Sequence, residues 1–507
     1  MDSRKQLHGG RIMVVQHNMQ AMNASRMLNI TANNQAKSTE KLSSGYRINR
    51  AADDAAGLSI SEKMRKQIRG LDQASTNAQD GVSAVQTAEG ALTEVHSMLQ
   101  RMNELAVQAS NGTNSESDRS SIQDEINQLT TEIDRVAETT KFNETYLLKG
   151  DNGTKSIQIA AHDAGLDGTL TQNTTKATFT VKALSMGDTT TIGGTKYTIG
   201  VSDTGATETG VKGQLENATK ILTGTNDDGT VKGFAEGTVV KIDGSSYTIS
   251  NDTTDPKTKM LKASDLEDFA SAGSTIEYNG KSVTLFKDEE NGVDNANSTV
   301  ITQEKAYALM ATELQAASSI GADEPITTST KQFVPKSGTA ATLAATNANV
   351  VKADDDDKVT FTLDKGKAEV QQDLTFNLHV GSDADMTNKI GVTISDMSSS
   401  SLGINGLNVA DATGKAATYA IDAIADAVSK VSSQRSSLGA IQNRLEHTIA
   451  NVDNVVENTN AAESRIRDTD MADEMVTYSK NNILAQAGQS MLAQANQSTQ
   501  GVLSILG

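Results

Sequence analysis

The stretch that decides the fold is residues 68–109, IRGLDQASTNAQDGVSAVQTAEGALTEVHSMLQRMNELAVQA. Small or apolar residues recur along it at steps that mostly alternate between three and four, at Leu71, Ser75, Ala78, Val82, Val85, Ala88, Leu92, Val95, Leu99, Met102, Ala106 and Ala109. Similar spacing returns more than 300 residues later, at Ile424, Val428, Val431, Leu438, Ile441, Leu445, Val452, Val455, Ala462 and Ile466. A sustained repeat of about 3.5 residues is typical of helices that supercoil against a partner. The sequence therefore predicts two long helices that pack lengthwise, one ending near residue 109 and one over about 416–465.

The segments outside these helices, 13–45 and 467–507, are rich in Asn, Gln, Ser and Ala and have thin apolar faces. They are predicted to be helices that bury too little to offset an ordering cost of roughly 1–2 kcal/mol per residue. We therefore expect them to become ordered only against partners. Residues 45–57 interrupt the pattern and are predicted to connect two helices. After a turn at Asn111-Gly112, we expect Ser117 to cap a shorter helix.

The centre of the chain differs from both ends. From near Gly150 to Gly406 it is rich in Thr, Gly, Asp and Lys, and alternating segments such as 177–181 and 359–363 predict strands. Three segments align without gaps and predict hairpins with Gly-Gly, Asp-Gly and Asn-Gly turns: 192–199, 242–249 and 278–285. Helical patterns follow at 261–272 and 302–317. The predicted fold class is mixed: a long α-helical coiled-coil bundle made by both chain ends, with inserted β-rich α+β outer domains.

Composition excludes several classes of function. The chain of 507 residues carries a net charge of −19, which argues against nucleic-acid binding. It has no Cys, and it has no apolar run of about 18 residues that would predict a membrane helix. The first twelve residues lack the apolar core of a secretory signal. Aromatic residues make up only 3% of the chain, which argues against a large compact enzyme core.

Two motif-dense blocks carry a resemblance to a known family. They are MVVQHNMQAMN (13–23) with KLSSGYRINRAADDAAGLSIS (41–61) and the 100–114 stretch, and AAESRIRD (461–468) with NILAQAG (482–488) and AQAN (493–496). These residues resemble bacterial flagellin. The resemblance implies an inner layer, D0, from 13–45 and 467–507, and an outer layer, D1, from 46–164 and 411–466. Variable outer domains would then occupy 165–410. Residues 1–12 have no counterpart in the family and suggest either a start site placed too far upstream or a remnant of cloning.

The resemblance also implies a function. The chain would be a structural subunit, exported through the flagellar type III apparatus, that polymerises outside the cell into the filament for motility. Expected partners are further copies of the chain, an export chaperone, and cap and hook-associated proteins. A hook–filament junction protein is the alternative, and a host-binding role for 165–410 stays open. Neither nucleic acid nor membrane is an expected partner.

Two groups of candidate site residues follow from the family pattern. The first resembles the segment recognised by the innate immune receptor Toll-like receptor 5, with the alternative that it only makes filament contacts: Gln100, Arg101, Glu104, Leu105, Gln108 and Glu125. The second group comprises two charge clusters between the helical layers, which either pair between subunits or form solvated turns: Arg47, Arg50, Asp53 and Asp54, and Arg465, Arg467, Asp468 and Asp470.

Motifs for catalysis are not found. The six His residues do not form a His-Glu-x-x-His zinc motif, and no Gly-x-Ser-x-Gly elbow occurs. Asn279-Gly280-Lys281-Ser282 resembles the end of a phosphate-binding loop, but the first Gly of that motif is replaced by Thr275. The acidic run 354–357 lacks the ligand spacing of a calcium loop. We therefore expect no enzyme activity, no catalytic or metal site and no cofactor.

Overall fold

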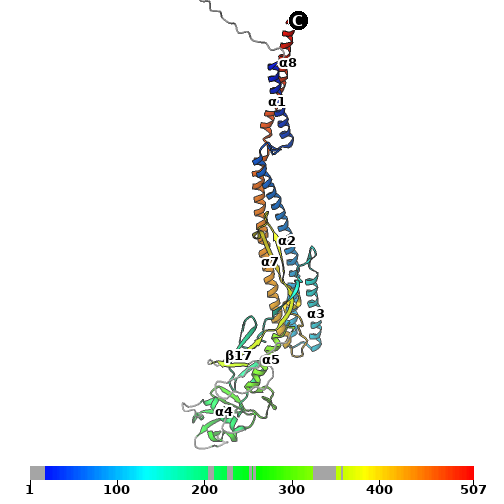
Figure 1. Cartoon of the computed structure of the whole chain (residues 1–507). Coiled ribbons are helices and arrows are strands. Elements are labelled where there is room, and N and C mark those ends of the chain that lie inside the picture. The colour runs from blue at the N-terminus through cyan, green and yellow to red at the C-terminus, as the bar shows by residue number, and fades with distance from the viewer. Residues whose placement is uncertain are drawn as a thin grey trace, which may run out of the picture. The chain divides into compact units, whose positions relative to one another are not determined.

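The computed structural model describes residues 18–203, 210–224, 232–250, 254, 259–323, 350–354 and 358–506 (Figure 1). Residues 1–12, for which a misplaced start or a remnant of cloning was expected, lie outside the described residues, as do 13–17 and most of the acidic run at 354–357. The chain forms two compact units. The first contains residues 1–82, 377–391 and 442–507, and the second contains 83–376 and 392–441.

The first unit holds both chain ends. Helix α1 (Met19–Ser44) begins at Asn18, whose side chain caps the helix by accepting a hydrogen bond from the Ala21 amide, and ends at Gly45 in the left-handed region. Helix α8 (Met471–Leu506) packs against α1, as the blue and red ribbons in Figure 1 show. Gly488 allows a close approach, because a Cβ there would lie 3.2 Å from Cδ1 of Leu28.

The heptad helices are α2 (Ala55–Ser110) and α7 (Lys415–Arg467). In the first unit they are joined by hydrogen bonds from Ser61 to Glu463 (2.7 Å) and from Ser75 to Asp453 (3.0 Å). The predicted heptad positions of α2 are buried, except Val82, which is partly exposed. Along α7, five of the predicted heptad positions are buried, namely Ile424, Val431, Leu438, Leu445 and Val452, and the other five are only partly buried, namely Val428, Ile441, Val455, Ala462 and Ile466.

Strands β19 (Leu374–His379) and β20 (Lys389–Ile394) form a hairpin with the 3₁₀ turn η2 (Met386–Asn388), and residues 377–391 belong to the first unit. This hairpin lies within the range 165–410 that the sequence assigns to outer domains. Two glycines of α2 make room for it: a Cβ on Gly81 would lie 2.2 Å from Cδ1 of Leu378, and one on Gly70 would lie 3.0 Å from Cβ of Ser382. Residues 377–391 therefore belong with the helical part of the chain.

In the second unit, α3 (Glu116–Thr139) is capped by Ser115, not by Ser117 as expected. Ser115 and Asp118 exchange hydrogen bonds in a capping box, which satisfies two amides that the helix leaves unpaired. Between α3 and α7, the short helix α6 (Ser399–Leu402) is held to α3 by Asp134, whose carboxylate accepts bonds from the amide and hydroxyl of Ser399.

Besides the β19–β20 hairpin, the described strands form three larger sheets and two small ladders. The first sheet orders β16 (Val350–Asp354), β17 (Lys358–Asp364), β5 (Lys176–Lys182) and β4 (Thr169–Gln172). The second orders β13 (Glu289–Glu290), β14 (Val293–Asp294), β15 (Val300–Ile301), β7 (Thr195–Ile199) and β6 (Thr189–Ile192). The third orders β10 (Met260–Lys262), β9 (Ser245–Ser250), β8 (Val239–Ile242), β11 (Thr275–Tyr278) and β12 (Lys281–Thr284). The ladders are β1 (Lys141–Phe142) with β2 (Thr145–Tyr146), and β3 (Asp151–Gln158) with β18 (Lys367–Gln372).

The three predicted hairpins are confirmed as β6–β7, β8–β9 and β11–β12. All six central turn residues have positive φ, as such turns require. Examples are Gly193 (52°), Asp243 (48°), Asn279 (51°) and Gly280 (80°). Each hairpin also receives a parallel partner at the end of its second strand, through the pairs Ile199–Ile301, Ile249–Leu261 and Leu285–Val201.

A helix follows each of these parallel partners along the chain. They are α5 (Gln303–Ser318), η1 (Ala263–Asp268) and α4 (Val211–Thr223), respectively. The first hairpin thus pairs with β15, which follows the third hairpin along the chain, and the third hairpin pairs with Val201, which follows the first. The second hairpin pairs with β10, the strand that directly follows it. The predicted helix 261–272 is shorter than expected, because its first residues form β10.

Two apolar cores fill these layers. One joins β5, β17 and α5 around Phe179, Phe361 and Tyr307, and the other lies under the third sheet around Ile249, Ile276 and neighbouring residues. Long helices at both chain ends and a strand-rich centre confirm the predicted mixed fold class.

Candidate functional site

Exposed apolar side chains gather on α1 and α8. They include Met19 (70% exposed), Val476 (69%) and Ile483 (66%). The full set, the terminal apolar face, is Met19, Met22, Met27, Ile30, Met471, Met475, Val476, Ile483, Leu484 and Met491. Of this set, Met475, Val476, Ile483 and Leu484 lie together on one stretch of α8, and exposed apolar side chains that cluster on a folded chain indicate a binding surface for another molecule.

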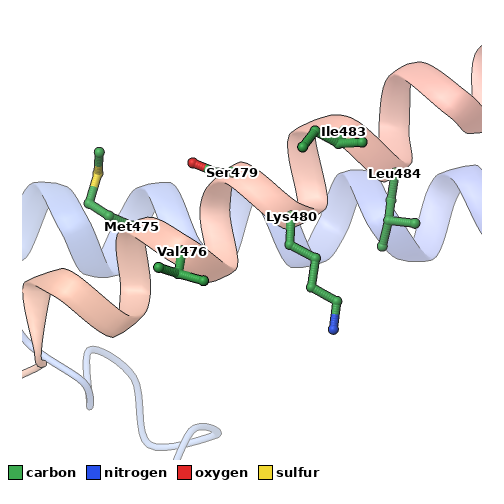
Figure 2. Close-up of a pocket in the computed structure, with 6 residues that line it drawn as sticks. All are labelled: Met475, Val476, Ser479, Lys480, Ile483 and Leu484. Carbon is green, nitrogen blue, oxygen red and sulfur yellow. The ribbon is translucent and has the colours of Figure 1, made fainter.

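Part of this face is a shallow groove on α8 (Figure 2). The α8 groove is lined by Met475, Val476, Ser479, Lys480, Ile483 and Leu484. Partly or fully covered residues of α8 recur at a different phase, at Glu474, Tyr478, Asn481, Ala485, Gly488, Leu492 and Ala495. At about 100° per residue, the centre of the groove lies on the opposite side of α8 from this covered stripe. Because α1 covers the stripe, the groove has no partner within the described part of the first unit.

Both chain ends also meet where the helical layers join. The Thr469 amide donates to the Gly45 carbonyl (3.0 Å) and the Arg47 amide to the Arg467 carbonyl (2.6 Å), and Tyr46 and Asp468 form a β-bridge. The Arg467 guanidinium stacks over the Tyr46 ring at 4.7 Å.

The carboxylates of the two charge clusters mainly accept hydrogen bonds from nearby backbone amides of the same subunit. Asp53 accepts bonds from the amides of Arg50 and Asn49, and the Arg50 bond is the main cause that lowers the pKa of Asp53. Asp470 caps α8 by accepting from Ala472 and Asp473. In the same way, Asp54 accepts from the amide of Gly57. Asp468 instead accepts from the side-chain hydroxyl of Ser464.

The arginines of the clusters are placed differently. Arg50 pairs with Glu40 at 2.9 Å, and the Arg47 guanidinium donates to the carbonyls of Arg465 and Ile466. Arg465 is exposed. Sequence reasoning missed Glu463, which is 8% exposed and binds both Ser61 and Arg65 across the two heptad helices.

The predicted receptor segment lies on α2 and α3 in the second unit. Arg101 pairs with Glu125 at 2.9 Å and with Glu104 at 3.2 Å, and all three side chains are about half exposed or more. The hydrogen bond to Glu125 is the main cause that raises the pKa of the Arg101 guanidinium. Gln100 and Gln108 are exposed nearby on α2. Leu105, by contrast, is only 2% exposed, so its side chain packs inside the subunit.

One buried and one partly buried charged group, Arg119 and Glu313, have structural roles that the sequence did not suggest. Arg119 is 4% exposed and donates to the carbonyls of Ala109 and Ala412, both at 3.0 Å. Glu313 of α5 binds Lys415 (2.9 Å) and the Tyr419 hydroxyl (2.6 Å), which fastens α5 to the start of α7. Burial, reinforced by Glu313, raises the pKa of Tyr419.

Two family profiles match the helical ends: "Bacterial flagellin N-terminal helical region" over residues 15–153 and "Bacterial flagellin C-terminal helical region" over residues 421–506. A flagellin of Clostridium tyrobutyricum is 38% identical over 96% of this chain and 100% of its own length. The chain belongs to the bacterial flagellin family. Flagellin B of Vibrio anguillarum is 34% identical over 97% of the chain and 99% of its own length.

Membership of the flagellin family makes the chain a structural subunit of the bacterial flagellar filament. A solved structure of FliC from Burkholderia pseudomallei matches 72% of this flagellin and 99% of that chain at 17% identity, with a TM-score of 0.26, which is too low to support an argument about geometry. Within the described residues of this flagellin, no group of three or more metal-binding side chains comes together. No described helix has the length and apolar character needed to cross a bilayer.

Proposed function

We propose that the terminal apolar face is the surface through which this flagellin polymerises, and that the α8 groove receives a second copy of the chain. The observation that carries the proposal is the position of the groove, on the side of α8 that α1 does not cover. Burial of such side chains contributes about 25 cal/mol per Å² of apolar surface, which is the main driving force of association. Further copies are the occupant because filament subunits pack against one another.

Single charged substitutions in the groove test this proposal. Val476→Asp and Ile483→Asp place a carboxylate on side chains that are 69% and 66% exposed in the subunit, so the free chain should fold as before. In the polymer the same carboxylate would be buried without a partner, which is strongly unfavourable. We expect elongation from filament seeds to slow by about tenfold or more.

Gln489→Asp is the matched control, because it adds the same charge to an exposed position of α8 outside the groove. It should elongate at close to the wild-type rate, and circular dichroism should show equal helix content in all variants. Equal slowing by Gln489→Asp would refute a specific role for the groove. Removal of residues 476–507 should abolish polymerisation, and filament growth by that truncated chain would refute the assignment of α8.

A second proposed function is recognition by Toll-like receptor 5. Its support is the exposed Arg101–Glu125 ion pair, flanked by Glu104, Gln100 and Gln108 on one surface of α2 and α3. Leu105 would act only by holding α2 in place, because its side chain is buried. Arg101→Ala should therefore weaken binding of the monomer to a soluble receptor ectodomain. Full binding by this variant, with unchanged helix content, would contradict the proposal.

The remaining partners also stay proposals. We propose contacts with neighbouring subunits through Arg50 and Arg465, which are exposed at the junction of the layers. Export by the flagellar type III apparatus, a chaperone, and cap and hook-associated partners fit a filament subunit. Abundance in sheared surface fractions separates it from a junction protein, which is present in few copies.

A further inference from the structure

The terminal apolar face is dominated by one residue type. Methionine supplies six of its ten side chains, with exposed fractions from 48% to 70%. These terminal methionines are Met19, Met22, Met27, Met471, Met475 and Met491. Elsewhere, Met102, Met310 and Met397 are at most 3% exposed, whereas Met386 is 72% exposed. Because the chain has no Cys, the thioether is its only sulfur group.

We propose that the terminal methionines are an oxidation site through which peroxides control filament growth. The peroxide transfers one oxygen atom to the thioether sulfur. The O–O bond breaks, an S=O bond forms and sulfur loses two electrons. The remaining peroxide oxygen takes the proton of the transferred oxygen and leaves as water from hydrogen peroxide, or as an alcohol from an alkyl hydroperoxide. The product is a polar side chain in place of a flexible apolar one.

This inference rests on the proposed polymerisation surface. Met475 lines the α8 groove, and the other five methionines lie on the same pair of helices. In the free subunit a sulfoxide oxygen stays hydrated, so the subunit itself should keep its fold. In the polymer that oxygen would lose its water without a built-in donor. We expect addition of an oxidised subunit to be about ten- to hundredfold weaker.

The site should be sensitive in only one state of the protein. A free subunit presents the six sulfurs to solvent, whereas a subunit in the filament has them covered by its neighbours. Peroxide would therefore stop the incorporation of new subunits and leave existing filament unmodified. The change is reversible, because methionine sulfoxide reductases restore the thioether.

Seeded elongation of the full chain tests the proposal. Subunits are treated with hydrogen peroxide until peptide mass spectrometry shows sulfoxide at the terminal methionines, while Met102 and Met310 serve as buried internal references. We expect elongation to fall by about ten- to hundredfold and to recover after treatment with the reductases. Assembled filaments given the same dose should show little sulfoxide at the terminal methionines.

Two variants separate this site from oxidation elsewhere. A chain with all six terminal methionines changed to Leu should elongate after peroxide as it does before. Met386→Leu is the control, because Met386 is 72% exposed but lies on the β19–β20 hairpin, and this variant should remain sensitive. Equal peroxide sensitivity of the sixfold variant and the wild type would overturn the proposal.

The outcomes also distinguish the two proposals. If Val476→Asp and Ile483→Asp elongate as fast as the untreated wild-type chain, the proposed polymerisation surface is wrong. If untreated chain elongates and fully oxidised chain elongates equally well, only the oxidation site is wrong. If the sixfold variant cannot elongate even untreated, reversal by the reductases on wild-type chain decides, and elongation that stays lost after full reduction overturns the inference.

Discussion

Gly81 and Gly90 are two glycines of one helix, and the structure predicts opposite effects when each becomes alanine. Both lie inside α2, where alanine is favoured over glycine by about 1 kcal/mol. Gly90 has no heavy atom within 4 Å of an added Cβ. Gly90→Ala should therefore raise the free energy of unfolding by close to that amount.

At Gly81 the added methyl group meets the β19–β20 hairpin. Its Cβ would lie 2.2 Å from Cδ1 of Leu378 and 3.3 Å from Cγ. Carbon atoms pack at about 3.5–4.0 Å, so the Leu378 side chain must move by more than 1 Å or the hairpin must lift. Overpacking of this kind costs about 1–3 kcal/mol, which equals or exceeds the gain in helix propensity. We expect Gly81→Ala to change stability by about 0 to −2 kcal/mol, leaving it about 1–3 kcal/mol below Gly90→Ala.

Thermal unfolding followed by circular dichroism at the helix band measures this difference, and each 1 kcal/mol corresponds to about 2–4 °C for a unit of this size. A Leu378→Ala background isolates the contact. There Gly81→Ala should regain the stabilisation seen for Gly90→Ala, because the clashing side chain is gone. If Gly81→Ala stabilises the wild-type chain as much as Gly90→Ala does, the proposed contact between residue 81 and the Leu378 side chain is refuted.

Two further predictions concern a buried charged group, Arg119, and a partly buried one, Asp422. Arg119→Met should lower the free energy of unfolding by about 3 kcal/mol, because carbonyls of Ala109 and Ala412 lose a charged donor; an effect below about 1 kcal/mol in denaturant titration would contradict this role. Burial raises the pKa of Asp422, His162 opposes the shift, and neighbouring carboxylates add to it. The folded chain therefore binds this proton more tightly, so the group favours folding below its unfolded pKa and loses that effect as pH rises through the folded value. The melting temperature of Asp422→Asn should exceed that of wild type more at pH 7 than at pH 4, and an equal difference at both would refute the assignment.

Local and periodic features were the ones that the sequence could predict. The heptads gave α2 and α7 because one 3.5-residue stripe specifies one buried face over many turns. The turn dipeptides gave the hairpins because Asn279-Gly280 and its equivalents tolerate positive φ at both positions. The cap of α3 was misplaced by two residues. The sequence did contain the signal for the correct cap, the Ser115-x-x-Asp118 capping box. Its two reciprocal hydrogen bonds make Ser115 a better cap than Ser117.

Long-range pairing could not be predicted. Nothing local indicates that Leu378 packs on Gly81 or that Glu313 meets Lys415, because these partners are about 100 to 300 residues apart and lie in segments without shared periodicity. The burial of Leu105 had a signal that the family resemblance concealed. It lies three residues after Met102 and six after Leu99, on the flank of the apolar stripe, where burial is the expected state.

The exposed apolar side chains of the terminal helices and the partly covered end of α7 have one physical explanation. Leu438 and Leu445 are fully buried, whereas Val455 and Ile466 near the helix end are only partly covered. If α8 instead turned its groove towards α1, the monomer would gain that burial and a second copy would find little apolar surface left to cover. A chain that polymerises must leave part of its apolar surface unsatisfied in the free subunit, and this one leaves it on the helices with the least intramolecular support. Ordering of α1 and α8 should therefore increase when a subunit joins the filament, since the same contacts that drive assembly complete their burial.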